Sequence, residues 1–303
     1  MSHEISFKRC EAVSSKVTAN EKSIAVSGEL KEQKMNIARK IIEAHKLKFG
    51  SLPPLQQCSV SGSALFNADC MDILPLIPDK SVQLILADLP YGTTSIDWDN
   101  VIPMDKLWEQ YNRIMTDNCA VVLFGSEPFS SLVRTSNLKM YKYDWKWEKA
   151  KATLHALCKK RPMKSDEDII VFYAKQPIYN PQMTIGEKYK GRNNTKNHKE
   201  LKGEWIIGQG SRTDNDGTRY PRTNIYFANE NKQGQHPTQK PLELIKYLIK
   251  TYSNENDMIL DNTMGSGTTC LGAKELNRKF IGIEKEVKYY ELAVGRVFGQ
   301  HCH

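Results

Sequence analysis

The chain has 303 residues, enough for one large or two modest domains with a buried core. Its 43 Lys and Arg against 35 Asp and Glu give a net charge of +8, which favours a polyanionic partner. A hydrophobic content of 40% excludes disordered and fibrous proteins. The seven Cys contain no C-x-x-C pair, and no apolar run approaches the roughly 18 residues of a membrane span. These features predict a soluble cytoplasmic protein without a disulfide framework or a clustered zinc site.

Two segments precede the main pattern. Residues 1–28 are rich in Ser, Lys and Glu and have little apolar surface to bury, so they predict a flexible arm. Within residues 29–50, apolar side chains such as Ile37 and Ile41 recur near helical spacing, and Gly50 ends the pattern. We expect an accessory helix that packs on the main domain.

From Ser63 onward the pattern alternates between strands and helices. Apolar runs at 81–87, 119–124 and 168–173 are typical of strands buried on both faces, and helical patterns at 104–115 and 127–136 lie between them. After Pro241 the alternation resumes, with a helix from Leu242, strands at 258–260 and 280–283, a helix at 267–277 and a last helical face at 287–297. This order predicts an α/β fold with a parallel sheet. Residues 183–235 are rich in Gly, Asn, Lys and Arg and separate the two parts. They predict an inserted functional segment, which their length favours, or a disordered loop.

The strongest local signal is the turn from Asp261 to Thr269, between a short strand and a helix. Its glycines let the backbone approach a ligand, and the helix N-terminus offers free N–H groups. It lacks the Gly-Lys-Ser/Thr of a P-loop and the spacing of a dinucleotide motif. Glu284 follows Asp261 by 23 residues at the tip of the next strand, where α/β folds hold a ribose diol. The pattern therefore predicts a ribose-bearing ligand; a turn used only for packing is the alternative.

The position of this turn predicts where the second half of the site lies. Only 19 residues follow Glu284, too few to complete the sheet, so its remaining strands must come from upstream. Because parallel strands end at one edge, Asp88, directly after the strand at 81–87, should lie beside the ligand cleft. There, Asp88, Leu89, Pro90 and Tyr91 combine an acid, a carbonyl before proline and an aromatic ring, a device suited to a planar amino group. A plain strand-end turn is the alternative for this motif.

Together these motifs resemble those of a known family. The sequences from Asp88 to Tyr91 and from Asp261 to Thr269 look like the catalytic and S-adenosylmethionine motifs of amino-group DNA methyltransferases, and their order resembles the permuted beta group. The sequence from His236 to Pro241 is similar to a further motif of this group. The chain departs from the family at Leu89, where proline is usual, and at Thr263 and Met264, where Phe or Pro is frequent.

The resemblance implies a fold and a division of the chain. It implies a circularly permuted Rossmann-like methyltransferase sheet, with the catalytic and cofactor-binding domain formed by 63–182 and 236–298. Residues 183–235 take the place of the target-recognition segment. The implied substrate is double-stranded DNA, and the implied reaction moves a methyl group from S-adenosylmethionine to the N6 amino group of a flipped adenine without a metal.

The resemblance also assigns roles to single residues. Asp88, Leu89, Pro90 and Tyr91 are the implied catalytic residues: the Asp88 carboxylate and the Leu89 carbonyl accept hydrogen bonds from the amino group, while Tyr91 stacks on the base. Asp69 and Cys70 border the adenine of the cofactor, Glu284 its ribose, Gly265 and Gly267 its methionine end, and Lys240 reaches its carboxylate. The implied cofactor turn also includes Asp261, Asn262, Ser266 and Thr268. For Asp69 and Cys70, a helix-start acid and a core thiol are an equal alternative.

Two basic regions suit a DNA duplex. Residues 139–164 hold nine Lys or Arg against two acids, with aromatic residues alternating as on a strand face. Residues 183–240 hold eleven against six. We expect phosphate contacts from both regions and base reading mainly from the second.

Three alternatives to an adenine-N6 methyltransferase follow from the same residues, and the sequence disfavours one of them. A cytosine-N4 methyltransferase faces the same electronic problem, although the resemblance favours adenine because of Asp88. A non-catalytic DNA-binding protein that kept the fold is a rival from another class. Methylation at carbon 5 of cytosine is disfavoured because no Cys follows a Pro. The DNA sequence recognised, a restriction endonuclease partner and a homodimer are left open.

Overall fold

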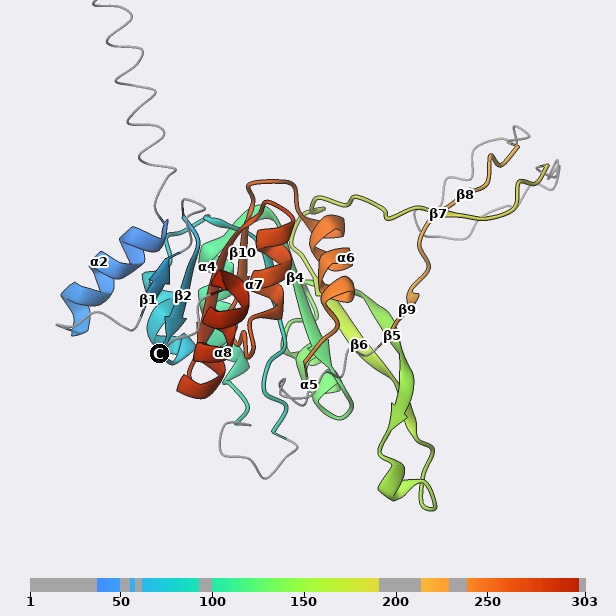
Figure 1. Cartoon of the computed structure of the whole chain (residues 1–303), viewed down its shortest axis with the longest axis horizontal. Helices are drawn as coiled ribbons and strands as arrows, with labels where there is room; N and C mark the ends of the chain where they lie inside the picture. The colour runs from blue at the N-terminus through green and yellow to red at the C-terminus, as the bar shows by residue number, and fades with distance from the viewer. Residues whose placement is uncertain are drawn as a thin grey trace, which may run out of the picture.

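The computed structural model describes residues 37–49, 55–57, 62–92, 100–190, 214–228 and 239–299 (Figure 1). The predicted arm at 1–28 and the motif residue His236 lie outside the described residues. Of the predicted accessory helix, the structure describes α2 (Ile37–Phe49). It packs on the 3-10 helix η1 (Leu74–Leu76) and buries Ala38 and Ile41 in the core. The expected packing on the main domain is confirmed for this part.

The described strands form a nine-stranded sheet, with a separate pair of short strands. The sheet order is β1-β2-β11-β10-β3-β4-β6-β5-β9. The strands are β1 (Leu55–Gln57), β2 (Ala64–Asn67), β3 (Val82–Ala87), β4 (Met115–Gly125), β5 (Tyr141–Thr153), β6 (Lys164–Phe172), β9 (Asn224–Phe227), β10 (Met258–Asp261) and β11 (Lys279–Glu284). The separate pair is β7 (Thr184–Ile185) with β8 (Thr218–Arg219).

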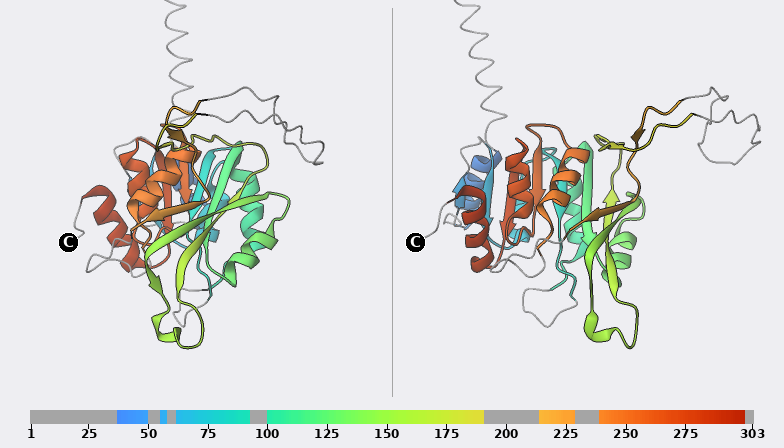
Figure 2. Two further views of the ribbon diagram at one scale, coloured as in Figure 1. Left: turned by 90° about the vertical axis from the view of Figure 1, so that its right-hand side faces the viewer. Right: turned by 45° about the vertical axis from the view of Figure 1, so that its right-hand side comes forward.

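Helices cover both faces of the sheet (Figures 1 and 2). One layer contains α2, α3 (Cys70–Ile73), η1, α4 (Met104–Ile114) and α5 (Phe129–Ser136), and the other contains α6 (Leu242–Tyr252), α7 (Thr268–Glu275) and α8 (Val287–Phe298). In β3, Ile85 faces the first layer while Leu84 and Leu86 face the second. Burial on both faces explains the continuous apolar runs in the sequence and confirms the α/β prediction. In the described ranges, every helix is too short or too polar to cross a lipid bilayer.

The prediction of a parallel sheet holds for part of it only. Strands β2, β11, β10, β3 and β4 run parallel, but β6 runs antiparallel to both β4 and β5. The expectation of a third parallel strand at 168–173 is therefore wrong. The reason is the β5–β6 hairpin. After its turn, the chain enters the sheet at the end where β4 finishes, so Asp168 in β6 lies opposite Gly125, the last residue of β4. An apolar run buried on both faces carries no signal of strand direction.

The hairpin of β5 and β6 extends past the edge of the sheet (Figure 1). Its turn contains the 3-10 helix η2 (His155–Leu157). Strand β9 pairs in parallel with β5, on the side of β5 that faces away from β6. Trp147 Nε1 donates to the carbonyl oxygen of Phe227 at 3.0 Å. The main sheet thus ends with a strand from within residues 183–235, the range predicted to form the inserted segment.

All five parallel strands end at one edge of the sheet. Their last residues are Asn67, Ala87, Gly125, Asp261 and Glu284. The polar turns that follow these strands gather at the same edge, as expected for the carboxyl ends of parallel strands.

Candidate active site

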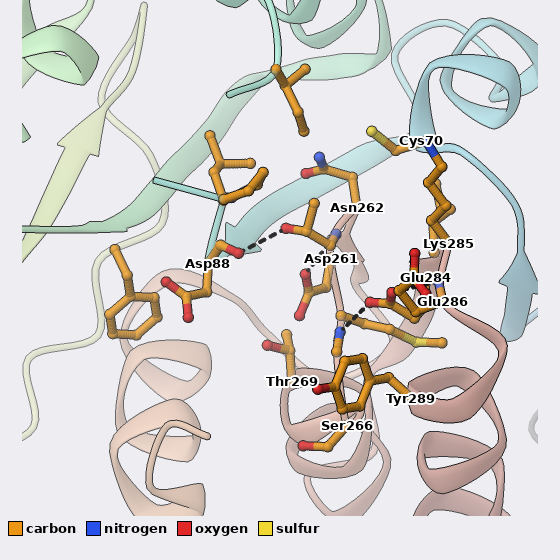
Figure 3. A pocket seen from close by; sticks show the side chains of 18 of the residues that line it. Cys70, Asp88, Asp261, Asn262, Ser266, Thr269, Glu284, Lys285, Glu286 and Tyr289 are labelled. Atoms are coloured by element: carbon orange, nitrogen blue, oxygen red, sulfur yellow. Dashed lines mark hydrogen bonds between the residues drawn. The ribbon is translucent and has the colours of Figure 1, made fainter. Parts of the chain in front are cut away.

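Two turns far apart in the chain meet at this edge. Strands β3 and β10 are direct neighbours, with Ile85 opposite Leu260. The hydroxyl of Thr263, in the turn after β10, donates to the backbone carbonyl of Asp88 at 3.0 Å (Figure 3). The predicted proximity of Asp88 and the Gly-rich turn is confirmed. Thr263, a departure from the usual family sequence, makes the contact that joins them.

The Asp88 carboxylate is held by two donors. Its Oδ1 accepts from the Tyr91 hydroxyl at 2.9 Å, and its Oδ2 accepts from Lys240 Nζ at 2.6 Å. The Asp88 side chain is still 30% exposed, whereas that of Lys240 is 7% exposed. Burial alone would lower the pKa of Lys240, but the Asp88 and Glu167 carboxylates hold it above its usual value. The ammonium of Lys240 therefore lies on Asp88 in this structure, and its expected contact with the cofactor carboxylate stays a prediction.

A second carboxylate completes this cluster. Glu167, in β6, has Oε1 at 3.1 Å from the Tyr91 hydroxyl and 3.4 Å from Lys240 Nζ. Its Oε2 pairs with Lys149 Nζ at 3.1 Å. Burial raises the pKa of Glu167, but the charges of Lys240 and Lys149 outweigh this effect and lower it. Two carboxylates are therefore balanced by two ammonium groups in a largely buried place.

The ring of Tyr91 packs against an aromatic neighbour. It stacks on Phe129, at the start of α5, with 4.8 Å between ring centroids and 19° between planes. Burial, followed by the charges of Asp88 and Glu167, raises the pKa of Tyr91 well above its usual value. The phenol is neutral and acts as a donor, and Phe129 covers one face of its ring.

The Gly-rich turn has a backbone that requires its glycines. Gly265 and Gly267 have φ of +51° and +75°, and a Cβ on Gly267 would lie 2.8 Å from the Cβ of Ala293. Glu284 accepts the N–H of Gly265 at 2.9 Å and that of Glu286 at 2.8 Å. The carboxylate at the tip of β11 thus fixes the turn after β10.

Ser266 and Thr268 make their contacts with other protein groups. Arg296, in α8, donates to the hydroxyl oxygens of Ser266 and Thr268 at 2.8 and 3.1 Å. Ser266 donates to the side-chain oxygen of Gln239 at 2.9 Å. These contacts fix the start of α7 relative to α8 and to the segment before α6.

Asp261 and Asn262 lie at the centre of the edge. Burial raises the pKa of the Asp261 carboxyl to about 7. Asn262 accepts from the Tyr111 hydroxyl at 2.6 Å through Oδ1, while its Nδ2 is buried with no hydrogen-bond partner in the part of the chain that the structure describes. A buried donor without a partner at a cavity wall is a position where a ligand can supply an acceptor.

The raised pKa of Asp261 predicts a pH dependence of stability. The unfolded chain releases this proton near pH 4 and the folded chain near pH 7, so stability falls as pH rises through this window. Asp261→Asn should remove this loss, which is about 2–4 kcal/mol at full size. In thermal unfolding without ligand, the melting temperature of the variant minus that of the wild type should increase from pH 5 to pH 8. A difference that stays constant or decreases over this range would contradict the assignment.

Asp69 and Cys70 combine a structural position with a place on the cavity wall. Asp69 caps α3 by accepting the N–H of Met71 at 2.9 Å, and it pairs with Lys285 at 3.2 Å. Cys70 is buried, and burial raises the pKa of its thiol to about 11. The structural alternative weighed from the sequence is confirmed; both residues also line the cavity, and their contact with a cofactor stays a prediction.

Most of these groups line one cavity of about 530 Å³, among them Asp88, Glu167 and Glu284. The Asp88 turn lies on one side of it, and the side containing Cys70, Glu284 and Lys285 lies across from it, with Asp261 between them (Figure 3). The volume is in the range of small-molecule sites. Among the described residues, no group of three or more His, Cys, Asp or Glu side chains is arranged to hold a metal ion.

The family model of the N6/N4 DNA methylases matches residues 82–295, more than two thirds of the chain. The chain belongs to this family. Among its relatives, the type II methyltransferase M1.MboII of Moraxella bovis is 28% identical over 249 residues, covering 76% of this chain and 94% of that protein. The type II methyltransferase M.HindIII of Haemophilus influenzae is 49% identical over 73 residues, 24% of this chain and 23% of that one.

Solved structures agree with the family. The methylase resembles the M1.HpyAVI–SAM complex with a TM-score of 0.53 and 25% identity, over 77% of this chain and 98% of that chain. The cytosine-N4-specific PvuII DNA methyltransferase has a TM-score of 0.56 at 15% identity, over 78% of this chain and 86% of that chain. The second likeness shows that the fold is shared.

Four residues of the methylase site escaped the sequence interpretation: Tyr111, Phe129, Lys149 and Glu167. Tyr111 and Phe129 fit the apolar faces of α4 and α5, so their pattern indicated core packing alone. Lys149 was counted within the basic region. Glu167 did carry a signal in the sequence, because the two acids Glu167 and Asp168 directly precede an apolar run.

Proposed function

We propose that this DNA methylase transfers a methyl group from S-adenosylmethionine to the N6 amino group of a flipped adenine at a specific DNA sequence. The observation that carries the proposal is the Asp88 carboxylate, which is partly exposed at a cavity of about 530 Å³ and is joined to the Gly-rich turn through the hydroxyl of Thr263. When bound, S-adenosylmethionine supplies the methyl group from its sulfonium. Glu284, Asp69 and Asn262 would hold its nucleoside, and the turn from Asp261 to Gly267 its methionine part.

The residues around Asp88 fit the chemistry of an exocyclic amino group. The nitrogen lone pair is delocalised into the base, so acceptors for its N–H bonds are needed to make it nucleophilic. The Asp88 carboxylate and the Leu89 carbonyl are such acceptors. Pro90 restricts the backbone of the turn. The ring of Tyr91 is backed by Phe129 on one face, and a flipped base would stack on the other.

The strand order supports a circular permutation of the sheet. Strands β10 and β11, which carry the Gly-rich turn and Glu284, come last in the chain but lie in the sheet between β2 and β3. The catalytic turn after β3 therefore precedes the cofactor turn in sequence and neighbours it in space. This arrangement is the one that the beta group of the family implies.

Adenine is favoured over cytosine because Asp88 is an acid. A carboxylate accepts a hydrogen bond more strongly than a serine hydroxyl, the residue that the family resemblance associates with cytosine-N4 enzymes. Cytosine-N4 methylation is the second candidate, and the PvuII likeness shows that the fold serves it in that protein. A non-catalytic role is disfavoured because Asp88, Tyr91 and Glu284 are all held at one cavity.

DNA contact by the hairpin can be tested by charge reversal. Lys159, Lys160 and Arg161 are exposed beyond the sheet edge, so replacing all three with Glu should weaken DNA binding about tenfold or more at low salt. The loss should be similar for all sequences and smaller at high salt. Lys46→Glu on α2 is the control for one charge reversal away from the hairpin, and Arg222→Glu in the predicted recognition segment should change which sequences are methylated. Identical effects of the hairpin and Arg222 changes would contradict separate roles.

The function as a whole is tested by mapping modified bases in a bacterial host. We expect expression of the protein to produce methylated adenines at one short sequence, and expression of Asp88→Ala to produce none. Purified protein should bind S-adenosylmethionine in calorimetry. A host genome without new methylated amino groups, together with no cofactor binding, would contradict the proposal.

A further inference from the structure

We propose that Glu167 is a positioning residue for methyl transfer: it accepts the hydrogen bonds of Tyr91 and Lys240 when the substrate amino group binds to Asp88. The inference rests on the proposed function and deepens it. Glu167 comes from β6, outside the motifs that point to the Asp88 turn and the Gly-rich turn. Its side chain is 8% exposed and lines the same cavity as Asp88.

The geometry makes Glu167 a second partner for each donor on Asp88. The Tyr91 hydroxyl lies 2.9 Å from Asp88 Oδ1 and 3.1 Å from Glu167 Oε1. Lys240 Nζ lies 2.6 Å from Asp88 Oδ2 and 3.4 Å from Glu167 Oε1. Both donors therefore bridge the two carboxylates, and each lies closer to Asp88.

A phenol has one hydrogen to donate, so Tyr91 serves the two carboxylates in alternation or shares a weaker bond between them. Without Glu167, Tyr91 and the buried Lys240 ammonium would have Asp88 as their carboxylate partner at this site, and they would compete with an incoming amino group for its oxygens. With Glu167 present, both donors can shift a short distance, and Asp88 is released to accept from the substrate.

Lys149 fixes Glu167 for this role. Its ammonium pairs with Oε2 at 3.1 Å, on the oxygen that neither Tyr91 nor Lys240 uses. The side chain of Lys149 is 14% exposed. Glu167 is thus anchored through one oxygen and offers the other to the donors of Asp88.

Glu167→Gln tests the proposal because it keeps the shape and removes the charge. We expect the single-turnover rate of methyl transfer to fall at least tenfold, with the Kd for S-adenosylmethionine within twofold of the wild type. The variant leaves the Lys149 ammonium without its carboxylate and should melt at a lower temperature, so both quantities are measured where wild type and variant are fully folded. Glu148→Gln, at an exposed position of β5, is the control and should leave the rate unchanged. In a Tyr91→Phe background, Glu167→Gln should reduce the single-turnover rate by a smaller factor than it does in the wild type, because the contact between the Tyr91 hydroxyl and Glu167 is already absent.

Two outcomes would overturn the proposal. One is a rate within twofold of the wild type in Glu167→Gln, and the other is the same loss in both backgrounds. NMR of ¹⁵N-lysine-labelled protein gives a readout without methyl transfer: the Lys240 ammonium signal, identified through Lys240→Arg, should shift in Glu167→Gln and stay in place in Glu148→Gln. If the wild type methylates no DNA but the Lys240 signal still shifts in Glu167→Gln, the proposed function is refuted while the Glu167–Lys240 contact stands.

Discussion

Asp88→Ala should reduce methyl transfer by a factor of about 10³ or more, while the Kd for S-adenosylmethionine changes less than twofold. The reason is that Asp88 faces the target amino group, whereas the expected cofactor contacts come from the turn after β10 and from Glu284. Lys240 keeps Glu167 as a carboxylate partner in the variant, so the buried ammonium is not left unpaired. Single-turnover assays and calorimetry measure the two quantities.

The control for this change is Asp105→Ala, at an exposed position in the first turn of α4. It removes the same charge without touching the cavity and should leave both quantities unchanged. A rate for Asp88→Ala within tenfold of the wild type would refute the catalytic role of Asp88.

Glu284→Ala should weaken S-adenosylmethionine binding by about 100-fold or more. The variant loses the carboxylate that accepts two backbone N–H groups, from Gly265 and Glu286, and that we expect to meet the ribose hydroxyls. Hydrogen bonds to a charged group contribute about 1.5–3 kcal/mol each, so the turn and the ligand contact should both be affected. Calorimetry with the cofactor product or S-adenosylmethionine checks the result.

Glu291→Ala, at an exposed position of α8, is the matched control. It should bind the cofactor like the wild type. Binding by Glu284→Ala within threefold of the wild type would show that this carboxylate supports the turn without contacting the ligand.

The sequence predicted the central strands because each is buried on both faces. Runs such as 81–87 and 119–124 have no polar alternation, and the structure places them between two helical layers. Their direction was predicted from alternation with helices, which holds for β3 and β4. It failed for β6 because a hairpin precedes that strand, and hairpin strands run antiparallel.

The same error concealed part of the site. A parallel strand at 168–173 would begin at the edge opposite Asp88, so acids at its start would be far from the cavity. The antiparallel β6 begins at the edge where Asp88 lies, and this brings Glu167 to within hydrogen-bond distance of Tyr91. Strand direction, a property of the whole sheet, therefore decided whether Glu167 could be found.

The motifs predicted that these residues lie near one another, but they did not predict which group each side chain contacts. The cavity brings together Asp69, Asp88, Lys240, Asp261 and Glu284, as the motifs indicated. The partner of Lys240 could not be predicted, because its ammonium reaches Asp88 across 152 positions of the chain through a long, rotatable side chain. Residue type and spacing locate such a side chain near a site but do not choose among its acceptors.

The identity of the methylated base tests the central claim most directly. DNA incubated with the purified protein and S-adenosylmethionine is digested to nucleosides, which are separated and identified by mass spectrometry, with Asp88→Ala as the control. We expect N6-methyladenine from the wild type and neither methylated nucleoside from the control. N4-methylcytosine without N6-methyladenine would contradict the assignment of adenine as the target of Asp88.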